Sequence, residues 1–152
     1  MIVAVTDDKW RQAVYEYVKP KAHINEDLKD QYSYIGFIEN NNILGGLLFS
    51  DYDGHNIFVH LALDTPRVCQ RRFIKMMFSY CFIQLKCSRM TAMCVNGYTR
   101  NERLLKGVGF TKEGVIRKVM KVKDKFVDSA IYGMLKEECR WVWNHNHRCH
   151  HQ

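Results

Sequence analysis

Residues 33 to 63 contain three short apolar runs that are separated by turn-forming residues. The runs are Ser33–Glu39, Ile43–Ser50 and Ile57–Leu63, and the segments between them include Asn40–Asn42 and Asp53–Gly54. Runs of this length, rich in Ile, Leu, Phe and Val and bounded by Asn, Asp and Gly, are typical of strands joined by tight turns. The pattern predicts an antiparallel meander, so the chain is restricted to folds that contain a sheet.

A helix and a fourth strand are predicted after the meander. Pro66 suits the first turn of a helix, where its missing N–H costs no hydrogen bond. The helix has one apolar stripe, formed by Phe73, Met76, Met77 and Tyr80. Met90–Val95 is short, apolar and typical of a strand. A strand, a helix and a further strand imply a crossover inside a mostly antiparallel sheet. The predicted class is therefore α/β (α+β), a mixed, mostly antiparallel sheet with helices on both faces.

Further elements are predicted on both sides of this unit. Near the start, Thr6 is a candidate cap for a helix that ends at Pro20, and Asn25 for a shorter helix that reaches about Lys29. The second half adds a short helix at Arg100–Lys106, which Gly107 or Gly109 ends. A hairpin follows, with strands at Val115–Val122 and Phe126–Met134.

The chain length and the distribution of charge suggest one domain with a polyanionic ligand. A single domain is expected over residues 1–143 of the 152, followed by a His- and Cys-rich tail at 144–152 that is expected to be disordered and to form no metal site. Residues 1–64 carry 5 Lys and Arg against 10 Asp and Glu, and residues 65–152 carry 18 against 6. The net charges of −5 and +12 favour a phosphorylated cofactor or nucleic acid held by the second half.

The cysteines and the N-terminal residues narrow the class of protein further. No two of the six cysteines form a C-x-x-C pair, which argues against a zinc ribbon or a thioredoxin-like motif and favours reduced thiols. No apolar run approaches the roughly 20 residues of a membrane span. Ile2–Val5 is followed at once by Asp7 and Asp8, which does not fit a secretory signal peptide. A cytoplasmic protein without a membrane partner is expected.

The second half contains an ordered set of residues that points to a known family. The set is Asn101–Lys106, Gly109-Phe110, Glu113-Gly114, Arg117, Asp128 and Tyr132–Leu135. In this order and spacing it resembles the GNAT family of acetyl-CoA-dependent N-acetyltransferases over about residues 30 to 141. The branch that acetylates protein N-termini and antibiotics is the most similar one. The size of the chain and the basic start of its central helix also resemble small GNAT-like proteins of phages.

The resemblance implies acetyl-CoA as co-substrate and a phosphate-binding loop at Arg67–Arg72. In the family this loop has the pattern Q/R-x-x-G-x-G/A at a helix N-terminus, where unpaired N–H groups attract anions. Here Gln70 and Arg72 replace both glycines, so they either obstruct the phosphates or, with Arg71, pair with them. A solvated basic helix face is the other interpretation. The implied cofactor-binding residues are Leu61, Ala62, Leu63, Arg67, Val68, Cys69, Gln70, Arg71, Arg72 and Asn101.

The candidate catalytic residues are His60 and Tyr98. The family's usual Asn falls at Tyr98, and its usual proton-donating Tyr falls at Leu105, which has no proton to give. Tyr98 is therefore the substitute donor, with packing at a strand end as the alternative. His60 in the third strand is the candidate base, because a neutral imidazole can deprotonate an ammonium group. A structural, hydrogen-bonded histidine is the alternative.

Two functions are compatible with these features. The first is an acetyl-CoA-dependent N-acetyltransferase that moves an acetyl group by direct transfer to a primary amine on a protein N-terminus, a lysine or a small cationic molecule. Glu26, Asp27 and Asp30 would attract a cationic acceptor, or else form a merely acidic surface. The alternative is a catalytically inactive GNAT-like protein that holds coenzyme A, nucleic acid or another acidic partner. Nucleic-acid binding would be weak, because no base-reading element is present.

Overall fold

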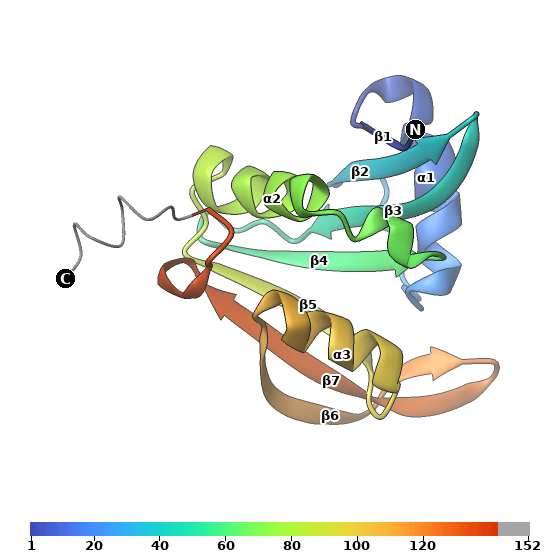
Figure 1. Ribbon diagram of the computed structural model, residues 1–152. Helices are drawn as coiled ribbons and strands as arrows, with labels where there is room; N and C mark the ends of the chain where they lie inside the picture. The colour runs from blue at the N-terminus through green and yellow to red at the C-terminus, as the bar shows by residue number, and fades with distance from the viewer. Residues whose placement is uncertain (143–152) are drawn as a thin grey trace.

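The computed structural model describes residues 1–142, which form a seven-stranded sheet with the strand order β1-β2-β3-β4-β5-β7-β6 (Figure 1). The strands are β1 (Val3–Val5), β2 (Tyr32–Glu39), β3 (Asn42–Ser50), β4 (Asn56–Leu63), β5 (Arg89–Val95), β6 (Thr111–Val122) and β7 (Lys125–Leu135). Every neighbouring pair is antiparallel except β4 and β5, which are parallel. The predicted mixed, mostly antiparallel sheet is confirmed. The tail at 144–152 lies outside the described residues.

Helices cover both faces of this sheet, as Figure 1 shows. They are α1 (Asp8–Lys21), α2 (Arg71–Ser79) and α3 (Thr99–Val108), with short helical turns at Pro66–Val68, Tyr80–Gln84 and Lys136–Glu138. Successive side chains of a strand point to opposite faces. In β3, Leu48 therefore joins the core under α1, whereas Leu47 and Phe49 join the larger core under α2 and α3.

A pair of glycines brings α1 unusually close to the sheet. Gly36 of β2 and Gly46 of β3 lie directly opposite each other. A Cβ on Gly36 would lie 2.6 Å from Val14 Cγ2, and one on Gly46 would lie 2.7 Å from Val18 Cγ2. Both valines are completely buried. Because both glycines lack a side chain, α1 can pack directly against β2 and β3. This contact fixes the position of α1 on that face of the sheet.

The N-terminal third differs from the sequence predictions at three places. The residue that caps α1 is Asp7 rather than Thr6, and its side chain makes no capping hydrogen bond. Pro20 lies inside the last turn, because the helix continues to Lys21 and the ring removes only one hydrogen bond near its end. The predicted short helix from Asn25 is wrong, since residues 22–31 form turns and irregular backbone.

The long helix predicted from Pro66 is divided into two parts. Pro66 opens a single turn, in which the hydroxyl of Thr65 accepts a hydrogen bond from the backbone N–H of Arg67 at 3.3 Å. Gln70 then has extended dihedral angles, so α2 starts only at Arg71. The later strands and helices agree with the predictions to within a few residues, and Gly109, with φ +114°, ends α3.

Gly46→Ala is expected to destabilise the protein by about 1–3 kcal/mol, because the new methyl group overpacks the contact between α1 and β3. Gly107→Ala is the matched control: it lies in α3, where a Cβ meets nothing within 4 Å. That change should be neutral or stabilise by up to about 1 kcal/mol through helix propensity. Urea unfolding measures the free energy of unfolding of both variants. Equal effects of the two substitutions would contradict the close approach of α1 to β3.

Candidate active site

The parallel strands β4 and β5 separate part of the way along their length. Asn56–Val59 pairs with Arg89–Ala92, and no pairing between the two strands follows in the described chain. Beyond this point β4 stays paired with β3 as far as Leu63, and β5 stays paired with β7 as far as Val95. The strands therefore open into a V whose inner edges carry backbone groups without a strand partner (Figure 1).

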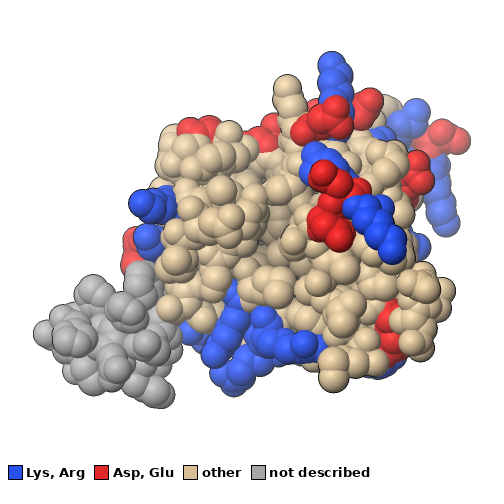
Figure 2. Space-filling view, turned by 90° about the horizontal axis from the view of Figure 1, so that it is seen from above, with Lys and Arg blue, Asp and Glu red and all other residues tan. Residues whose placement is uncertain are grey.

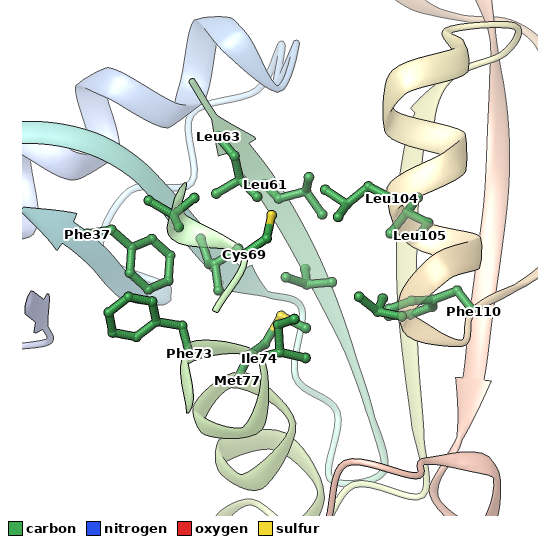
Figure 3. Close-up of a pocket in the computed structure, with 14 residues that line it drawn as sticks. Phe37, Leu61, Leu63, Cys69, Phe73, Ile74, Met77, Leu104, Leu105 and Phe110 are labelled. Atoms are coloured by element: carbon green, nitrogen blue, oxygen red, sulfur yellow. The ribbon is translucent and has the colours of Figure 1, made fainter. Parts of the chain in front are cut away.

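An apolar cleft lies beside the open part of β4, on the face covered by α2 and α3. In Figure 3, Leu61 of β4 and Leu104 of α3 point towards each other across it. The lining residues are all apolar: Phe37, Leu47, Val59, Leu61, Leu63, Val68, Cys69, Phe73, Ile74, Met77, Leu104, Leu105, Val108 and Phe110. Such a surface suits a largely aliphatic chain, which would have to take its hydrogen bonds from the backbone of the V.

The loop before α2 carries the predicted phosphate-binding residues. Two of them, Arg67 and Arg72, are bound to other parts of the protein, and Gln70 is bound within the loop. Arg67 forms a bidentate ion pair with Glu39 at the end of β2, with N···O distances of 2.9 and 2.6 Å. Arg72 donates to the carbonyl of Ile2 at 2.8 Å, and the amide of Gln70 donates to the carbonyl of Arg67 at 2.9 Å. These side chains hold the loop in place.

The other predicted cofactor residues fall into separate environments. Four of them line the apolar cleft: Leu61, Leu63, Val68 and Cys69. Ala62 points to the opposite face and joins the core under α1. The guanidinium of Arg71 lies 5.7 Å from the ring centre of Trp141. Asn101 is half-buried in the first turn of α3. The N-terminus of α2 has no side-chain cap, so its first N–H groups remain suitable for an anion.

Charge is unevenly distributed over the surface above these elements. Seen from above, Lys and Arg side chains gather along one margin, acidic and basic side chains mix on the other side, and the centre is largely uncharged (Figure 2). On the face seen in this view, the basic side chains therefore form a margin around an uncharged centre.

Arg100 and Tyr98 lie at the start of α3, near the mouth of the V. Arg100 donates to the carbonyl of Leu63 at 2.7 Å and so spans from α3 to the end of β4. Tyr98 precedes the first residue of α3, and 49% of its surface is exposed. Its ring is therefore not packed into the core, and its hydroxyl is accessible at the end of β5.

A buried carboxylate, Glu102, holds the start of α3 in position. It accepts hydrogen bonds from the backbone N–H of Gly97 at 2.7 Å, from Lys112 Nζ at 2.9 Å and from the hydroxyl of Tyr132. The bond from Tyr132, followed by that from Lys112, lowers the pKa of Glu102 to about 2. Sequence reasoning assigned Glu102 only to the family motif, because its partners come from β6, β7 and the turn after β5.

His60 lies on the opposite face of the sheet from the apolar cleft. It follows Val59, the last residue of β4 that pairs with β5, so it stands where the V begins. Its Nε2 lies 2.8 Å from the hydroxyl oxygen of Ser50, and this hydroxyl donates to Asp51 Oδ2 at 3.1 Å. Burial lowers the pKa of His60, and the charge of Asp51 acts in the opposite direction. The imidazole is therefore neutral at pH 7 and able to accept a proton.

An acidic pocket adjoins His60 through Ser50. Its lining residues are Glu26, Asp27, Leu28, Gln31, Ser50, Asp51 and Tyr52. Two of the three predicted acceptor-binding carboxylates line it, Glu26 and Asp27, whereas Asp30 does not. Asp51 was missed, because it follows β3 and no spacing in the sequence connects it with Glu26. Hydrogen bonds from the N–H of Lys29 and the hydroxyl of Tyr15 lower the pKa of Asp27.

The wall of this pocket is tied to the final hairpin. The side-chain amide of Asn25 donates to the carbonyl of Lys121 at 3.1 Å, and its oxygen accepts from the N–H of Lys121 at 3.0 Å. Asn25 therefore uses its side chain in a contact with β6 instead of capping a helix. The segment that carries Glu26 and Asp27 is consequently held at a fixed distance from the hairpin.

The splayed parallel pair within a seven-stranded, mostly antiparallel sheet is the fold of the GNAT acetyltransferases. Solved structures with this fold include the spermidine/spermine N-acetyltransferase SpeG of Vibrio cholerae, with a TM-score of 0.69 and 10% identity over 90% of this chain and 96% of that one. A GNAT-family acetyltransferase from Bacillus anthracis has a TM-score of 0.64 and 19% identity over 90% and 96%. The ribosomal-protein-S5-alanine acetyltransferase of Vibrio fischeri has a TM-score of 0.63 and 19% identity over 86% and 73%.

The sequence is similar to a protein of the same kind from a prophage. It is 28% identical over 115 residues to the SPbeta prophage-derived uncharacterized N-acetyltransferase YokL of Bacillus subtilis. The match covers 72% of this chain and 65% of that relative, so the chain spans less than two thirds of its length. No protein-family model matches the chain. The predicted resemblance to the GNAT family and to its phage-like members is confirmed.

Two further properties of the described residues concern membranes and metals. None of the helices within residues 1–142 is long and apolar enough to cross a bilayer. The same residues contain no group of three or more His, Cys, Asp or Glu placed to hold a metal ion. The histidines of the tail lie outside the part of the chain that the structure describes.

The Glu102 contacts predict a specific loss of stability in acid. Because the pKa of Glu102 is about 2 in the folded protein and near 4.5 in the unfolded chain, its contribution is complete above pH 4.5 and is lost as the pH falls towards 2. Glu102→Gln should therefore lower stability at neutral pH and flatten its dependence on pH between 4.5 and 2. Urea midpoints over this range measure the effect. The exposed Glu137→Gln control should retain the slope of the wild type.

Proposed function

We propose that this protein is an N-acetyltransferase that moves an acetyl group from acetyl-CoA directly to a primary amine. One observation carries the proposal: the V between β4 and β5 has an apolar cleft on one face and a neutral histidine beside an acidic pocket on the other. Two substrates can therefore approach from opposite faces of the sheet and meet at the V. The similarity to YokL, which is named an N-acetyltransferase, supports the same activity.

The residues on the cleft side fit acetyl-CoA. The amide-bearing arm of coenzyme A can hydrogen-bond to the backbone of Leu61–Leu63 on the open side of β4, where the carbonyl of Leu63 is already held by Arg100. Its aliphatic parts can contact the apolar lining. Its phosphates can bind at the uncapped N-terminus of α2, next to the guanidinium of Arg71. The side chains that replace the loop glycines, Gln70 and Arg72, are bonded to backbone carbonyls of the protein. Those bonds favour a site in which neither side chain covers the helix N-terminus.

The chemistry then depends mainly on positioning. A primary amine must lose a proton before it can attack, and His60 is a neutral base at the point where the V begins. A C–N bond to the acetyl carbon forms, the C–S bond breaks, and the coenzyme A thiolate leaves and is protonated. Tyr98 is the residue at the mouth of the V with an accessible hydroxyl that can supply this proton. No covalent intermediate on the protein is needed, so holding both substrates in line supplies much of the rate.

The acidic pocket favours a small cationic amine as acceptor. Glu26, Asp27 and Asp51 line it, and the contacts of Asp27 keep that carboxylate ionised. A molecule with two or more ammonium groups can place one of them among these carboxylates and another beside His60. The fold similarity to SpeG, whose name states spermidine and spermine as its substrates, supports this class of acceptor.

Wild-type protein is expected to release thiol from acetyl-CoA when a primary amine is present. Arg71→Ala should raise the KM for acetyl-CoA about tenfold, equivalent to ~1.4 kcal/mol, because it removes a charge beside the α2 N-terminus. Lys75→Ala is the control, as it removes an exposed cation one turn further along α2. Coenzyme A binding by calorimetry, without thiol release for any amine in a panel, would instead favour the inactive binding protein.

Glu26→Gln is expected to raise the KM for a diamine or triamine about two- to fivefold, because a partly exposed charge pair contributes up to about 1 kcal/mol. The KM for a monoamine should change less, since that molecule has no second ammonium group for the pocket. Asp30→Asn is the matched control, because Asp30 belongs to the same segment and does not line the pocket. Steady-state kinetics with both kinds of amine measure these KM values. If Glu26→Gln and Asp30→Asn change them equally, the acidic pocket does not bind the acceptor.

A further inference from the structure

We propose that Ser50 and Asp51 are positioning residues that hold the imidazole of His60 in one tautomer, with Nδ1 as the nitrogen that accepts a proton from the acceptor amine. This inference rests on the proposed acetyltransferase function. It assigns roles to two residues at the end of β3 that neither the sequence pattern nor the resemblance indicates.

The hydrogen bonds at Ser50 determine the tautomer. A serine hydroxyl has one proton, and a carboxylate at neutral pH can only accept. The hydroxyl of Ser50 donates to Asp51 Oδ2 at 3.1 Å, so it has no proton left for His60. Both contacts are hydrogen bonds only if Nε2 of His60, at 2.8 Å from the same oxygen, carries a hydrogen and donates it. In a neutral ring the other nitrogen, Nδ1, then has the free lone pair.

The free nitrogen is also accessible. Nδ1 of His60 has no hydrogen-bond partner among residues 1–142. Across those residues, the hydroxyl of Tyr17 is the one fully buried side-chain nitrogen or oxygen that lacks a partner. Nδ1 is therefore in contact with solvent, although the imidazole as a whole is half-buried. A proton can reach Nδ1 from outside, whereas Nε2 is committed to the protein.

The backbone explains why these two residues can reach the ring. Leu48 of β3 lies opposite His60, so Ser50 is the diagonal neighbour on the same face of the sheet. At the end of β3 the backbone of Asp51 has a φ of +56°, a conformation that Asp and Asn adopt more readily than most residues. The strand thus ends in a turn that leaves the carboxylate of Asp51 beside the Ser50 hydroxyl and in the wall of the acidic pocket.

The proposed step balances as follows. The acceptor R–NH3⁺ gives one proton to Nδ1, which leaves R–NH2 and an imidazolium whose second proton, on Nε2, still points at Ser50. The amine nitrogen then forms a bond to the acetyl carbon, and the C–S bond breaks. The coenzyme A sulfur takes a proton from the hydroxyl of Tyr98, and the second proton lost by nitrogen replaces it on Tyr98. The products are R–NH–CO–CH3, coenzyme A and one proton on His60, which returns to solvent. The positive charge that forms on His60 is stabilised by Asp51.

The tautomer can be measured without any activity. In ¹⁵N-labelled protein, two-bond ¹H–¹⁵N spectra distinguish protonated from unprotonated ring nitrogens, and the His60 signals are those missing from His60→Gln. Wild type is expected to show a protonated Nε2 and an unprotonated Nδ1 at pH 7.5. Ser50→Ala should show averaged shifts of two tautomers. A protonated Nδ1 in the wild type would overturn the inference, whatever the activity.

Kinetics test the role of this arrangement in the reaction. Ser50→Ala should lower kcat about tenfold and leave the KM for acetyl-CoA unchanged, and Ser50→Thr, which keeps the hydroxyl, should restore part of the rate. Ser33→Ala is the matched control, because its hydroxyl accepts a hydrogen bond from Tyr80 at 2.7 Å on the other side of the sheet. An unchanged kcat in Ser50→Ala would overturn the positioning role.

The pH profile separates this inference from the proposed function. Activity needs neutral His60, so kcat/KM should fall as the pH drops through the lowered pKa of His60, below 6.5. Asp51→Asn removes the charge that raises this pKa and should move the fall to still lower pH. If the wild type is active and the pH profile of Asp51→Asn is the same as that of the wild type, the positioning role is wrong and the proposed function stands. A wild type that acetylates no amine contradicts the proposed function and the base role together, while the spectra still determine the tautomer.

Discussion

The separation of β4 from β5 after Val59 is the feature on which the rest of the site depends. Strand edges with unpaired N–H and C=O groups are costly when they are buried and useful when a ligand can pair with them. Here each strand is held from its outer side, β4 by β3 and β5 by β7, so both stay straight while the gap between them opens. Arg100 satisfies the carbonyl of Leu63 at the mouth, and Glu102 fixes the start of α3 behind it.

The two faces of the V have opposite chemical character because of the alternation of side chains along β4. Leu61 and Leu63 point towards α2 and α3 and form an apolar cleft, whereas His60 and Ala62 point towards α1. On that second face, the glycine pair lets α1 pack closely against the sheet. Asn25 holds the acidic segment against β6. One strand therefore separates a surface suited to a long aliphatic donor from a surface suited to a cation.

The loop at 67–72 differs from the family pattern, but the N-terminus of α2 still has no side-chain cap. Where the family has glycines, the side chains of Gln70 and Arg72 are bonded to backbone carbonyls, and Arg67 is paired with Glu39. These contacts stabilise a loop that has lost its flexible residues. Of the basic residues in this loop, Arg71 is the one whose guanidinium forms no hydrogen bond or ion pair within residues 1–142, and it lies near the ring of Trp141.

Local patterns in the sequence determined the order of the strands and helices and the crossover, because each depends on residues close together in the chain. The predicted apolar stripe of the central helix is right for Phe73 and Met77 and wrong for Met76, which is 40% exposed, and it missed the completely buried Phe78. The candidate base came from its residue type and its predicted place in the third strand. Two of the pocket carboxylates, Glu26 and Asp27, came from the acidic first half and the resemblance to the GNAT family. The partners of these groups did not. Asp51 lines the same pocket as Glu26, and Asn25 and Glu102 are hydrogen-bonded to Lys121 and Tyr132. Each of these contacts forms only when segments distant in sequence are brought together. Hydrogen bonds between such residues depend on register and on which face a side chain occupies, and a shift of one residue reverses that face. For this reason the tertiary structure alone decided that Ala62 turns away from the cleft, that Arg67 is engaged by Glu39, and that His60 is held by Ser50.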